Sequence, residues 1–370
     1  MTYYPSLDHQ WETVSAAQAG FNEARLNQAV VFAEQHESSW PRDLEHAGAV
    51  PGLSQFEKPP WDQALGPFKS RGGGNGLLLK DGRIAARWGD PGRVEMTFSI
   101  AKSYLSILTG IALGDKLIAD VDAPVKDSVA GNYFSSTQNS TITWRHLLNQ
   151  TSEWEGTLWD KPDLVDRNRR VGPGTDNSRK GEHRDLQAPG SFWEYNDVRV
   201  NLLALALLHV FREPLPSVLK TRVMDPIGCS DTWSWHGYRN SFINIDGQSM
   251  QSVPGGTHWG GGIQINSFDH ARLALLVHCG GRWNQHRYLP EGWTQASRTP
   301  CPIAPGYGFL WWLNTLQHEW PGVPESSYAA LGAGNHILWI DPVNDLVLVA
   351  RWIEQEHISG LLAQIVAALE

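Results

Sequence analysis

The chain has 370 residues, of which 41% are hydrophobic and 19% are charged, and its formal net charge is −9. This length predicts one large two-lobed domain or two domains rather than a small module. The acidic balance, with no run of Lys or Arg, argues against a nucleic-acid partner, which requires a basic surface.

Several further features limit the class of protein. Three cysteines, Cys229, Cys279 and Cys301, form no Cys-x-x-Cys pair, and their odd number favours reduced thiols. The segment from Met1 to Phe21 lacks the basic start and apolar run of a signal peptide, and no stretch of about 18 uninterrupted apolar residues occurs. We therefore expect a cytoplasmic chain without a membrane segment. The 14 His form no His-Glu-x-x-His motif, so we expect no metal and no cofactor.

The N-terminal part predicts a helix, a long connection and a hairpin. Apolar residues recur at helical spacing over 22–40, and Pro41 ends the pattern. Residues 41–74 are rich in Pro, Gly and charge, which is typical of a long loop at the border of an active site. Two apolar runs, 76–80 and 83–88, flank Asp81-Gly82 and predict an antiparallel hairpin.

The next segment, Phe98-Ser-Ile-Ala-Lys102, offers a hydroxyl and an amine three positions apart. Residues at this spacing lie side by side on a helix, and the apolar residues after Lys102 predict a buried helix. A lysine in such a setting can hydrogen-bond Ser99 and, if burial destabilises its ammonium, take the serine proton. The alternative is an N-cap serine followed by a lysine that extends to water. A second Ser-x-x-Lys segment, Ser217 to Lys220, lacks this context.

A tyrosine in the middle of the chain is the candidate second proton-transfer group. Between 103 and about 208, helical patterns alternate with turn-rich loops. Tyr195 stands where the loop 189–197 meets an apolar helix over 198–208, so its phenol can point into a cleft. There it would accept the proton of Ser99 and donate it to the leaving group, if Lys102 is close enough to favour this. Packing is the alternative role for such a tyrosine.

The C-terminal part predicts a second hairpin and a final helix. Two runs of β-branched and aromatic residues, 336–340 and 346–353, flank a turn, and an apolar helix is expected over 358–369. Small residues at 331–334 precede the first of these strands, which we expect at a sheet edge, so that the amides of Ser99 and Ala333 are candidates for an oxyanion site. A tight turn is the alternative.

Strands near both ends of the chain and helices between them predict an α+β fold. We expect an antiparallel sheet flanked by helices, formed by residues 1–112 and 256–370. A mainly helical lobe, residues 113–255, is expected as an insertion.

In chain order, these segments resemble the serine β-lactamase-like superfamily, over roughly residues 76–352. The likeness rests on the Ser99-x-x-Lys102 motif, on Tyr195-Asn196-Asp197, and on a small-residue turn before a strand that ends in Asp-Pro. The segments that carry it also include Thr143-Trp-Arg-His-Leu-Leu148 and Trp259-Gly-Gly-Gly262. The most similar members are class C-like hydrolases, family VIII esterases and 6-aminohexanoate-dimer hydrolases.

The resemblance implies a β-lactamase/transpeptidase-like fold and a role for each matched residue. Ser99 would be the acylated nucleophile, Lys102 and Tyr195 its proton-transfer partners, and Ala333 the second oxyanion amide. From the residues themselves, the small-residue loop with a polar tip that holds His258 and Trp259 would form a wall of the substrate cleft, and a tight turn is the alternative. Gly332 would lie beside the substrate.

Two departures from the family pattern bear on the substrate. The family's Tyr-x-Asn ends here in Asp197, and no Lys-Thr-Gly or His-Thr-Gly precedes the C-terminal strand. In penicillin-recognising relatives that cation and hydroxyl are taken to hold the substrate carboxylate. We therefore expect a small ester or uncharged amide rather than a β-lactam, and Asp197 would favour a substrate that carries an amine.

The leading hypothesis is thus a serine hydrolase that forms and hydrolyses an acyl-enzyme. A catalytically silent binding or regulatory protein on the same fold is the alternative from another class. A metallohydrolase is the third, which the missing ligand spacing disfavours. The sequence does not predict the oligomeric state.

Overall fold

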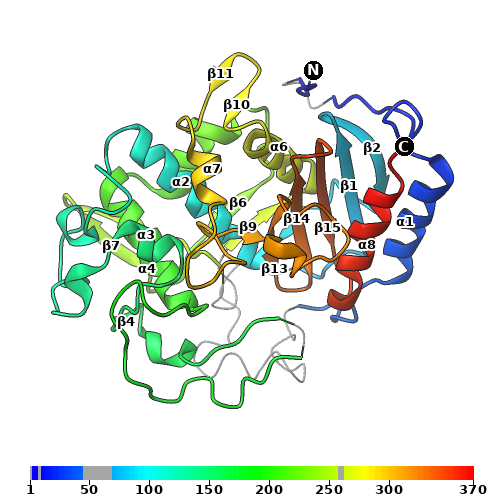
Figure 1. Ribbon diagram of the computed structural model, residues 1–370. Coiled ribbons are helices and arrows are strands. Elements are labelled where there is room, and N and C mark those ends of the chain that lie inside the picture. Colours follow the sequence, from blue (N-terminus) through cyan, green and yellow to red (C-terminus); the bar gives the residue numbers. More distant parts are fainter. Residues whose placement is uncertain (1, 7–9, 45–68, 173, 257–261) are drawn as a thin grey trace.

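The computed structural model describes residues 2–6, 10–44, 69–172, 174–256 and 262–370. Its central element is a six-stranded antiparallel sheet in which strands from the first quarter of the chain lie beside strands from the last (Figure 1). In spatial order the strands are β12 (Trp312–Leu313), β13 (Tyr328–Gly332), β14 (His336–Asp341), β15 (Leu346–Arg351), β1 (Asn75–Lys80) and β2 (Arg83–Trp88).

Two hairpins and their pairing explain how the two chain ends form one sheet. In the first hairpin, Asp81 and Gly82 have φ of 51° and 82°, the positive values that a two-residue type I′ turn requires. β1 then pairs with β15, so that Leu78 lies opposite Leu348. The predicted antiparallel sheet built from both chain ends is confirmed.

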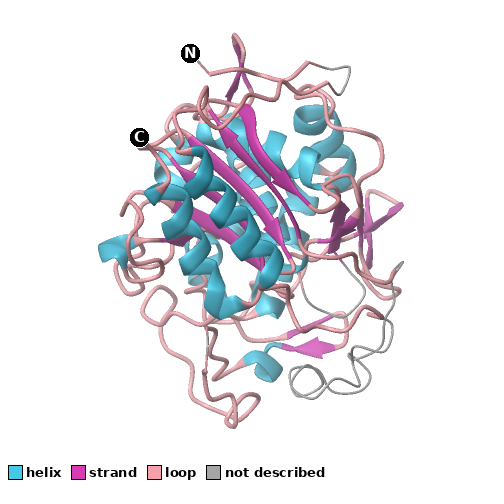
Figure 2. Cartoon of the chain, turned by 90° about the vertical axis from the view of Figure 1, so that its right-hand side faces the viewer, coloured by secondary structure: helices cyan, strands magenta, loops and turns pink. Residues whose placement is uncertain are grey.

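Helices cover both faces of the sheet, and Figure 2 shows two of them lying across the face turned toward the viewer. These are α1 (Glu23–Gln35) and α8 (Gln355–Ala367), whose apolar residues form one core cluster with the sheet. α6 (Ser267–His278) and α2 (Ala101–Gly114) belong to the larger cluster on the other face. Every residue of β14 and β15 is buried, as expected for strands covered on both faces.

The helical part of the molecule packs against α2 and contains the remaining helices. α4 is buried from Asp197 to Leu208 and contacts both α2 and α3. The helices are α3 (Trp144–Leu148), α4 (Asp197–Phe211), α5 (Leu215–Leu219) and α7 (Trp293–Ser297).

The remaining strands form small sheets. One three-stranded sheet consists of β3 (Glu95–Met96), β9 (Gly262–Ile265) and β6 (Ser234–His236). The two-stranded pairs are β4 (Thr157–Leu158) with β5 (Lys161–Pro162), β7 (Phe242–Ile245) with β8 (Gln248–Gln251), and β10 (Arg282–Trp283) with β11 (His286–Arg287).

Three details differ from the sequence-based expectation. The first helix ends at Gln35, because Glu37 bridges to Ile353 at the end of the sheet instead of continuing the helix. The final helix begins earlier than expected, at Gln355. The expectation that the strand after Ala333 lies at a sheet edge is wrong, because β13 and β12 extend the sheet beyond it. The lobe boundaries at 112 and 256 stay a prediction.

Across the described residues, no single helix is long and apolar enough to span a membrane. Only the bent pair Asp197–Phe211 and Leu215–Met224 reaches the necessary length and composition, with a bend of 74° between its halves.

Candidate active site

The candidate nucleophile lies in a short turn that leads into α2. Phe98–Ile100 form a 3₁₀ turn, and Ala101 begins α2. Phe98 has a φ of 51°, an unusual value for a bulky residue, and its buried ring packs against the rings of Trp40 and His336, each 5.7 Å away. This packing holds the turn in place and leaves Ser99 half-exposed at the head of a buried helix.

Two glycines from distant segments lie directly against this turn. A Cβ on Gly332, at the end of β13, would lie 2.3 Å from the carbonyl oxygen of Thr97. A Cβ on Gly256, which has a φ of +104°, would lie 2.8 Å from the Cα of Ser99. Both distances are too short for real atoms, so the backbone approaches the turn closely only because these residues are glycines. Ala333 follows Gly332 in the turn between β13 and β14 and is itself exposed.

Lys102 joins the nucleophile to a buried carboxylate. Its Nζ donates a hydrogen bond to Ser99 Oγ at 2.8 Å and forms an ion pair with Asp197 Oδ1 at 2.6 Å. The side chains of Lys102 and Asp197 are each 2% exposed. Asp197 is the first residue of α4, and Asn196 before it caps the helix by accepting from the amide of Arg199. The helix start therefore fixes the carboxylate against the lysine.

Asp197 is also the first member of a chain of alternating buried charges. Its other carboxylate oxygen pairs with Arg169. A guanidinium nitrogen of Arg169 lies 3.8 Å from Oδ2 of Asp166. The other carboxylate oxygen of Asp166, Oδ1, lies 3.1 Å from the Nζ of Lys180. The same Asp166 oxygen that faces Arg169 accepts a hydrogen bond from the amide of Asp197 at 3.0 Å. Each charge thus has an opposite partner, as buried charges require.

These contacts shift two pKa values. Burial works to raise the pKa of Asp166, but the nearby cations Arg169, Lys180 and Lys161 outweigh it and hold this pKa below its usual range. Burial works to lower the pKa of Arg169, but the carboxylates of Asp197 and Asp166 outweigh it and raise this pKa. Arg169 therefore stays charged and helps to hold Asp197 in place.

The ring of Tyr195 contacts both of the cations that bind Asp197. Its centroid is 4.8 Å from Lys102 Nζ and 5.2 Å from Arg169 Cζ, within cation–π range. The residue is buried, and its ring contacts Trp312, Tyr307 and Trp193 at 5.7, 6.5 and 6.4 Å. In the described part of the chain its hydroxyl makes no hydrogen bond to Ser99. The structure brings the alcohol, the amine and the phenol ring together at one end of α2 and α4.

Two further residues expected at the site, in the segment before β9, cannot be placed. His258 and Trp259 lie outside the described residues. The charged segment that contributes Arg169, Asp166 and Lys180 was not expected from the sequence, although its dense alternation of Asp with Arg and Lys is a signal that could have found it. No group of three or more His, Cys, Asp or Glu that could hold a metal ion occurs among the described residues.

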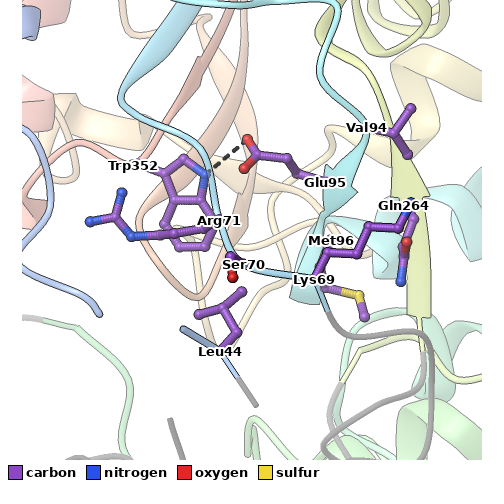
Figure 3. A pocket seen from close by; sticks show the side chains of 9 residues that line it. All are labelled: Leu44, Lys69, Ser70, Arg71, Val94, Glu95, Met96, Gln264 and Trp352. Carbon is purple, nitrogen blue, oxygen red and sulfur yellow. Dashed lines mark hydrogen bonds between the residues drawn. The ribbon is translucent and has the colours of Figure 1, made fainter. Parts of the chain in front are cut away.

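A second polar cluster surrounds Trp352, whose ring contacts that of Phe98 at 6.3 Å (Figure 3). There Trp352 Nε1 donates to Glu95 at 2.9 Å, and the guanidinium of Arg71 lies 4.9 Å from the Trp352 ring centroid. The pocket that these residues line has a volume of about 10 Å³, the room that one water molecule needs. This cluster therefore supports the turn and cannot receive a substrate.

A serine hydroxyl bonded to a buried lysine ammonium, at the head of a helix and beside an antiparallel sheet, is the arrangement of the Ser-x-x-Lys hydrolases. A sequence profile of the beta-lactamase family matches residues 62–352, well over half of the chain. The chain therefore belongs to the beta-lactamase family. Comparison with curated protein sequences gives no match.

Solved structures with the same fold include hydrolases and penicillin-binding protein homologues. A structure described as a 6-aminohexanoate-dimer hydrolase from Bacillus anthracis has a TM-score of 0.59 and 16% identity, over 80% of this chain and 78% of its own. EstCE1, described as a hydrolase with promiscuous acyltransferase activity, has a TM-score of 0.57 and 16% identity over 96% and 98% of the two chains. A penicillin-binding protein homologue from Caulobacter crescentus has a TM-score of 0.60 and 13% sequence identity, over 93% of this chain and 98% of its own.

At these identities the structural likeness establishes the fold alone. Together with the family match, it agrees with the predicted β-lactamase/transpeptidase-like fold, which is confirmed. The family and its neighbours indicate a hydrolase of the serine β-lactamase superfamily.

Proposed function

We propose that this protein hydrolyses a small ester or amide through an acyl-enzyme on Ser99. The observation that carries the proposal is the 2.8 Å hydrogen bond from the buried Lys102 ammonium to Ser99 Oγ. An ammonium at this distance stabilises the negative charge that develops on the oxygen as it attacks a carbonyl carbon. The second Ser-x-x-Lys segment has no such arrangement.

Tyr195 is the proposed proton carrier. Lys102 is paired with Asp197 and so acts as a hydrogen-bond donor, which leaves the phenolate form of Tyr195 to accept the proton of Ser99. The cations Lys102 and Arg169, which both contact its ring, compensate the negative charge of this form. The protonated Tyr195 then donates to the oxygen or nitrogen of the leaving group as the bond from that atom to the carbonyl carbon breaks. The acyl group stays on Ser99.

Deacylation repeats these steps with water as the nucleophile. Tyr195 takes a proton from the water, the hydroxide adds to the acyl carbon, and Ser99 leaves with the proton returned to it. The amides of Ser99 and Ala333 are the proposed donors to the carbonyl oxygen in both halves. Support for Ala333 comes from Gly332, whose close packing on Thr97 ties this turn to the nucleophile.

The same geometry supports an ester or linear amide over a β-lactam. The segment before β14, Leu331-Gly332-Ala333, has neither the lysine nor the threonine of the Lys-Thr-Gly motif that relatives that recognise penicillin carry. The carboxylate of Asp197 is already occupied by Lys102 and Arg169, which argues against its predicted use in binding a substrate amine.

Covalent labelling and kinetics test the proposal together. Wild-type protein treated with a fluorophosphonate probe should gain one adduct by intact mass spectrometry, which maps to the peptide that contains Ser99. Ser99→Ala should lose the adduct and lower kcat/KM for p-nitrophenyl acetate by about 1,000-fold or more.

Ser217→Ala is the matched control and should behave as wild type. Circular dichroism should show that both variants fold. An unlabelled wild type without esterase activity would instead favour the silent binding protein, and full activity in Ser99→Ala would overturn the choice of nucleophile.

A further inference from the structure

A large pocket next to Tyr195 is not used by the steps above. Its volume is about 530 Å³, which suits a small organic group. One wall comes from the loop that carries Arg169, Arg170 and Arg179, and the other from Phe192 and Trp193 together with Trp312 at the start of β12.

The pocket adjoins the proton carrier directly. Trp193 and Trp312 both line the pocket, and their rings lie 6.4 and 5.7 Å from the ring of Tyr195. Arg169, a third lining residue, contacts the face of the same ring. A group bound in this pocket therefore lies beside the ring of Tyr195.

The proposed proton transfer explains why a pocket beside Tyr195 matters for the substrate. Tyr195 must hand its proton to the leaving group, so the leaving group departs on the side of the phenol. The acyl group, by contrast, stays on Ser99 near the glycines of the nucleophile turn. The pocket is therefore placed to receive the leaving group.

The charges of the pocket select what that group carries. Glu194 is buried and forms ion pairs with Arg184 and Arg199 at 2.9 and 3.3 Å. Arg179 forms a solvent-exposed ion pair with Glu182, which holds it weakly. Arg170 is exposed and lines the pocket. Two guanidinium groups can therefore turn to a ligand, against the single carboxylate of Asp176.

The walls select the shape. Phe192, Trp193 and Trp312 present aromatic surface, which favours a flat or apolar body. Guanidinium groups bind carboxylates with paired, planar hydrogen bonds. Arg170 and Arg179 would therefore bind a substrate carboxylate in place of the Lys-Thr-Gly lysine, which this chain lacks.

We propose that this pocket is the leaving-group subsite and that it binds a flat, apolar alcohol or amine that carries a carboxylate. The natural substrate is then an ester or amide whose leaving group is an anionic, preferably aromatic, acid. This inference rests on the proposed function, since it needs acyl transfer to Ser99.

Two aryl esters that differ in one charge test it. 4-Acetoxybenzoate and its methyl ester give the same acyl-enzyme, but only the first has a leaving group with a carboxylate. The measured quantity is the ratio of their kcat/KM values in each variant relative to the wild type, because the intrinsic reactivity of each ester then cancels. Arg170→Gln with Arg179→Gln should lower this ratio about 10- to 100-fold, the usual effect of losing hydrogen bonds to a charged group.

Arg222→Gln is the matched control, because Arg222 pairs with Asp115 outside the pocket and should leave the ratio unchanged. In the double variant, 4-hydroxybenzoate should also inhibit hydrolysis of p-nitrophenyl acetate less well than in the wild type. An unchanged ratio in the double variant, with Ser99-dependent hydrolysis intact, would overturn the subsite and leave the proposed function standing. If the wild type showed neither labelling of Ser99 nor any esterase activity, both the proposed function and the leaving-group subsite would be overturned.

Discussion

The chain contains two Ser-x-x-Lys segments, and the structure places them in opposite environments. Lys102 is 2% exposed, donates to Ser99 and pairs with one buried carboxylate. Lys220 is 44% exposed and pairs with Asp225 and Asp231 at 2.6 and 2.7 Å. Ser217, its partner in the motif, is exposed on the five-residue helix α5.

The two segments differ because the chain takes a different conformation after each serine. After Ser99 the chain forms a regular α-helix, so the residue three positions on points alongside the serine. After Ser217 the helix changes at Lys220 into a π-helical turn, Lys220–Met224, and the lysine turns outward to the two aspartates. The hydrogen bonds that Lys220 donates to Asp225 and Asp231 raise its pKa, so this lysine is held as a charged surface group. The motif has chemical meaning only where burial keeps the amine on the hydroxyl.

Replacing each lysine by methionine should give the largest contrast. Lys102→Met leaves the carboxylate of Asp197 without one of its two cations in a buried site, which costs about 3–5 kcal/mol of unfolding free energy. The change also removes the donor to Ser99, so kcat/KM for p-nitrophenyl acetate should fall by roughly 100- to 10,000-fold. Urea denaturation and steady-state kinetics measure the two effects.

Lys220→Met is the control for this change. It removes exposed ion pairs that contribute little, so activity and stability should stay near the wild-type values. If Lys102→Met kept wild-type activity, the buried amine would have no part in the reaction, and the contrast between the two segments would be one of stability alone.

A pair of glycines tests how tightly the nucleophile turn is held. Gly256 and Gly247 both have positive φ, at +104° and +83°, so alanine strains the backbone at both positions. Only at Gly256 does the new Cβ meet other atoms, since Gly247 has nothing within 4 Å. Gly256→Ala should displace Ser99 and lower kcat about 100-fold, whereas Gly247→Ala should cost about 1 kcal/mol of stability without affecting kcat. Equal kcat values in the two variants would show that the turn tolerates the displacement.

Local patterns were enough to predict the hairpins, the buried helix after Ser99 and the placement of sheet strands at both chain ends. Alternation, turn residues and apolar runs act over a few residues, and the sequence shows them directly. β13 was missed because Tyr328–Gly332 is a five-residue run made partly of small residues, which carry little strand preference. It becomes a strand only by pairing with β14, a contact that a local pattern does not contain.

In the candidate site, too, local contacts could be predicted from the sequence and long-range contacts could not. Spacing along one helix predicted the neighbourhood of Ser99 and Lys102, which the structure places 2.8 Å apart. The ion pair between Lys102 and Asp197 joins residues 95 positions apart through the packing of α2 on α4. The supporting cations Arg169 and Lys180 come from an irregular segment whose path no periodicity describes. Long-range charge pairing was therefore beyond the reach of the motifs.

The smallest expected effect concerns the buried charges behind Lys102, and it depends on pH. The cations around Asp166 hold its pKa in the folded protein below the ordinary value of 3.8. A carboxyl group whose pKa is lowered by folding stabilises the fold above its unfolded pKa, and this contribution is lost as the pH falls through the folded value. Asp166→Asn should therefore unfold more easily than the wild type at pH 7, and the difference should shrink below about pH 4. Urea denaturation at pH 7, 5, 4 and 3 measures it.

Asp122→Asn provides the comparison at the surface. Hydrogen bonds from Arg145 lower the pKa of Asp122 as well, but its side chain is 59% exposed, and solvent screens the pair. Its pH-dependent contribution should therefore be clearly smaller than that of Asp166. If the two variants lost stability equally, the chain of buried charges behind Lys102 would hold the site no more firmly than the exposed aspartates hold Lys220.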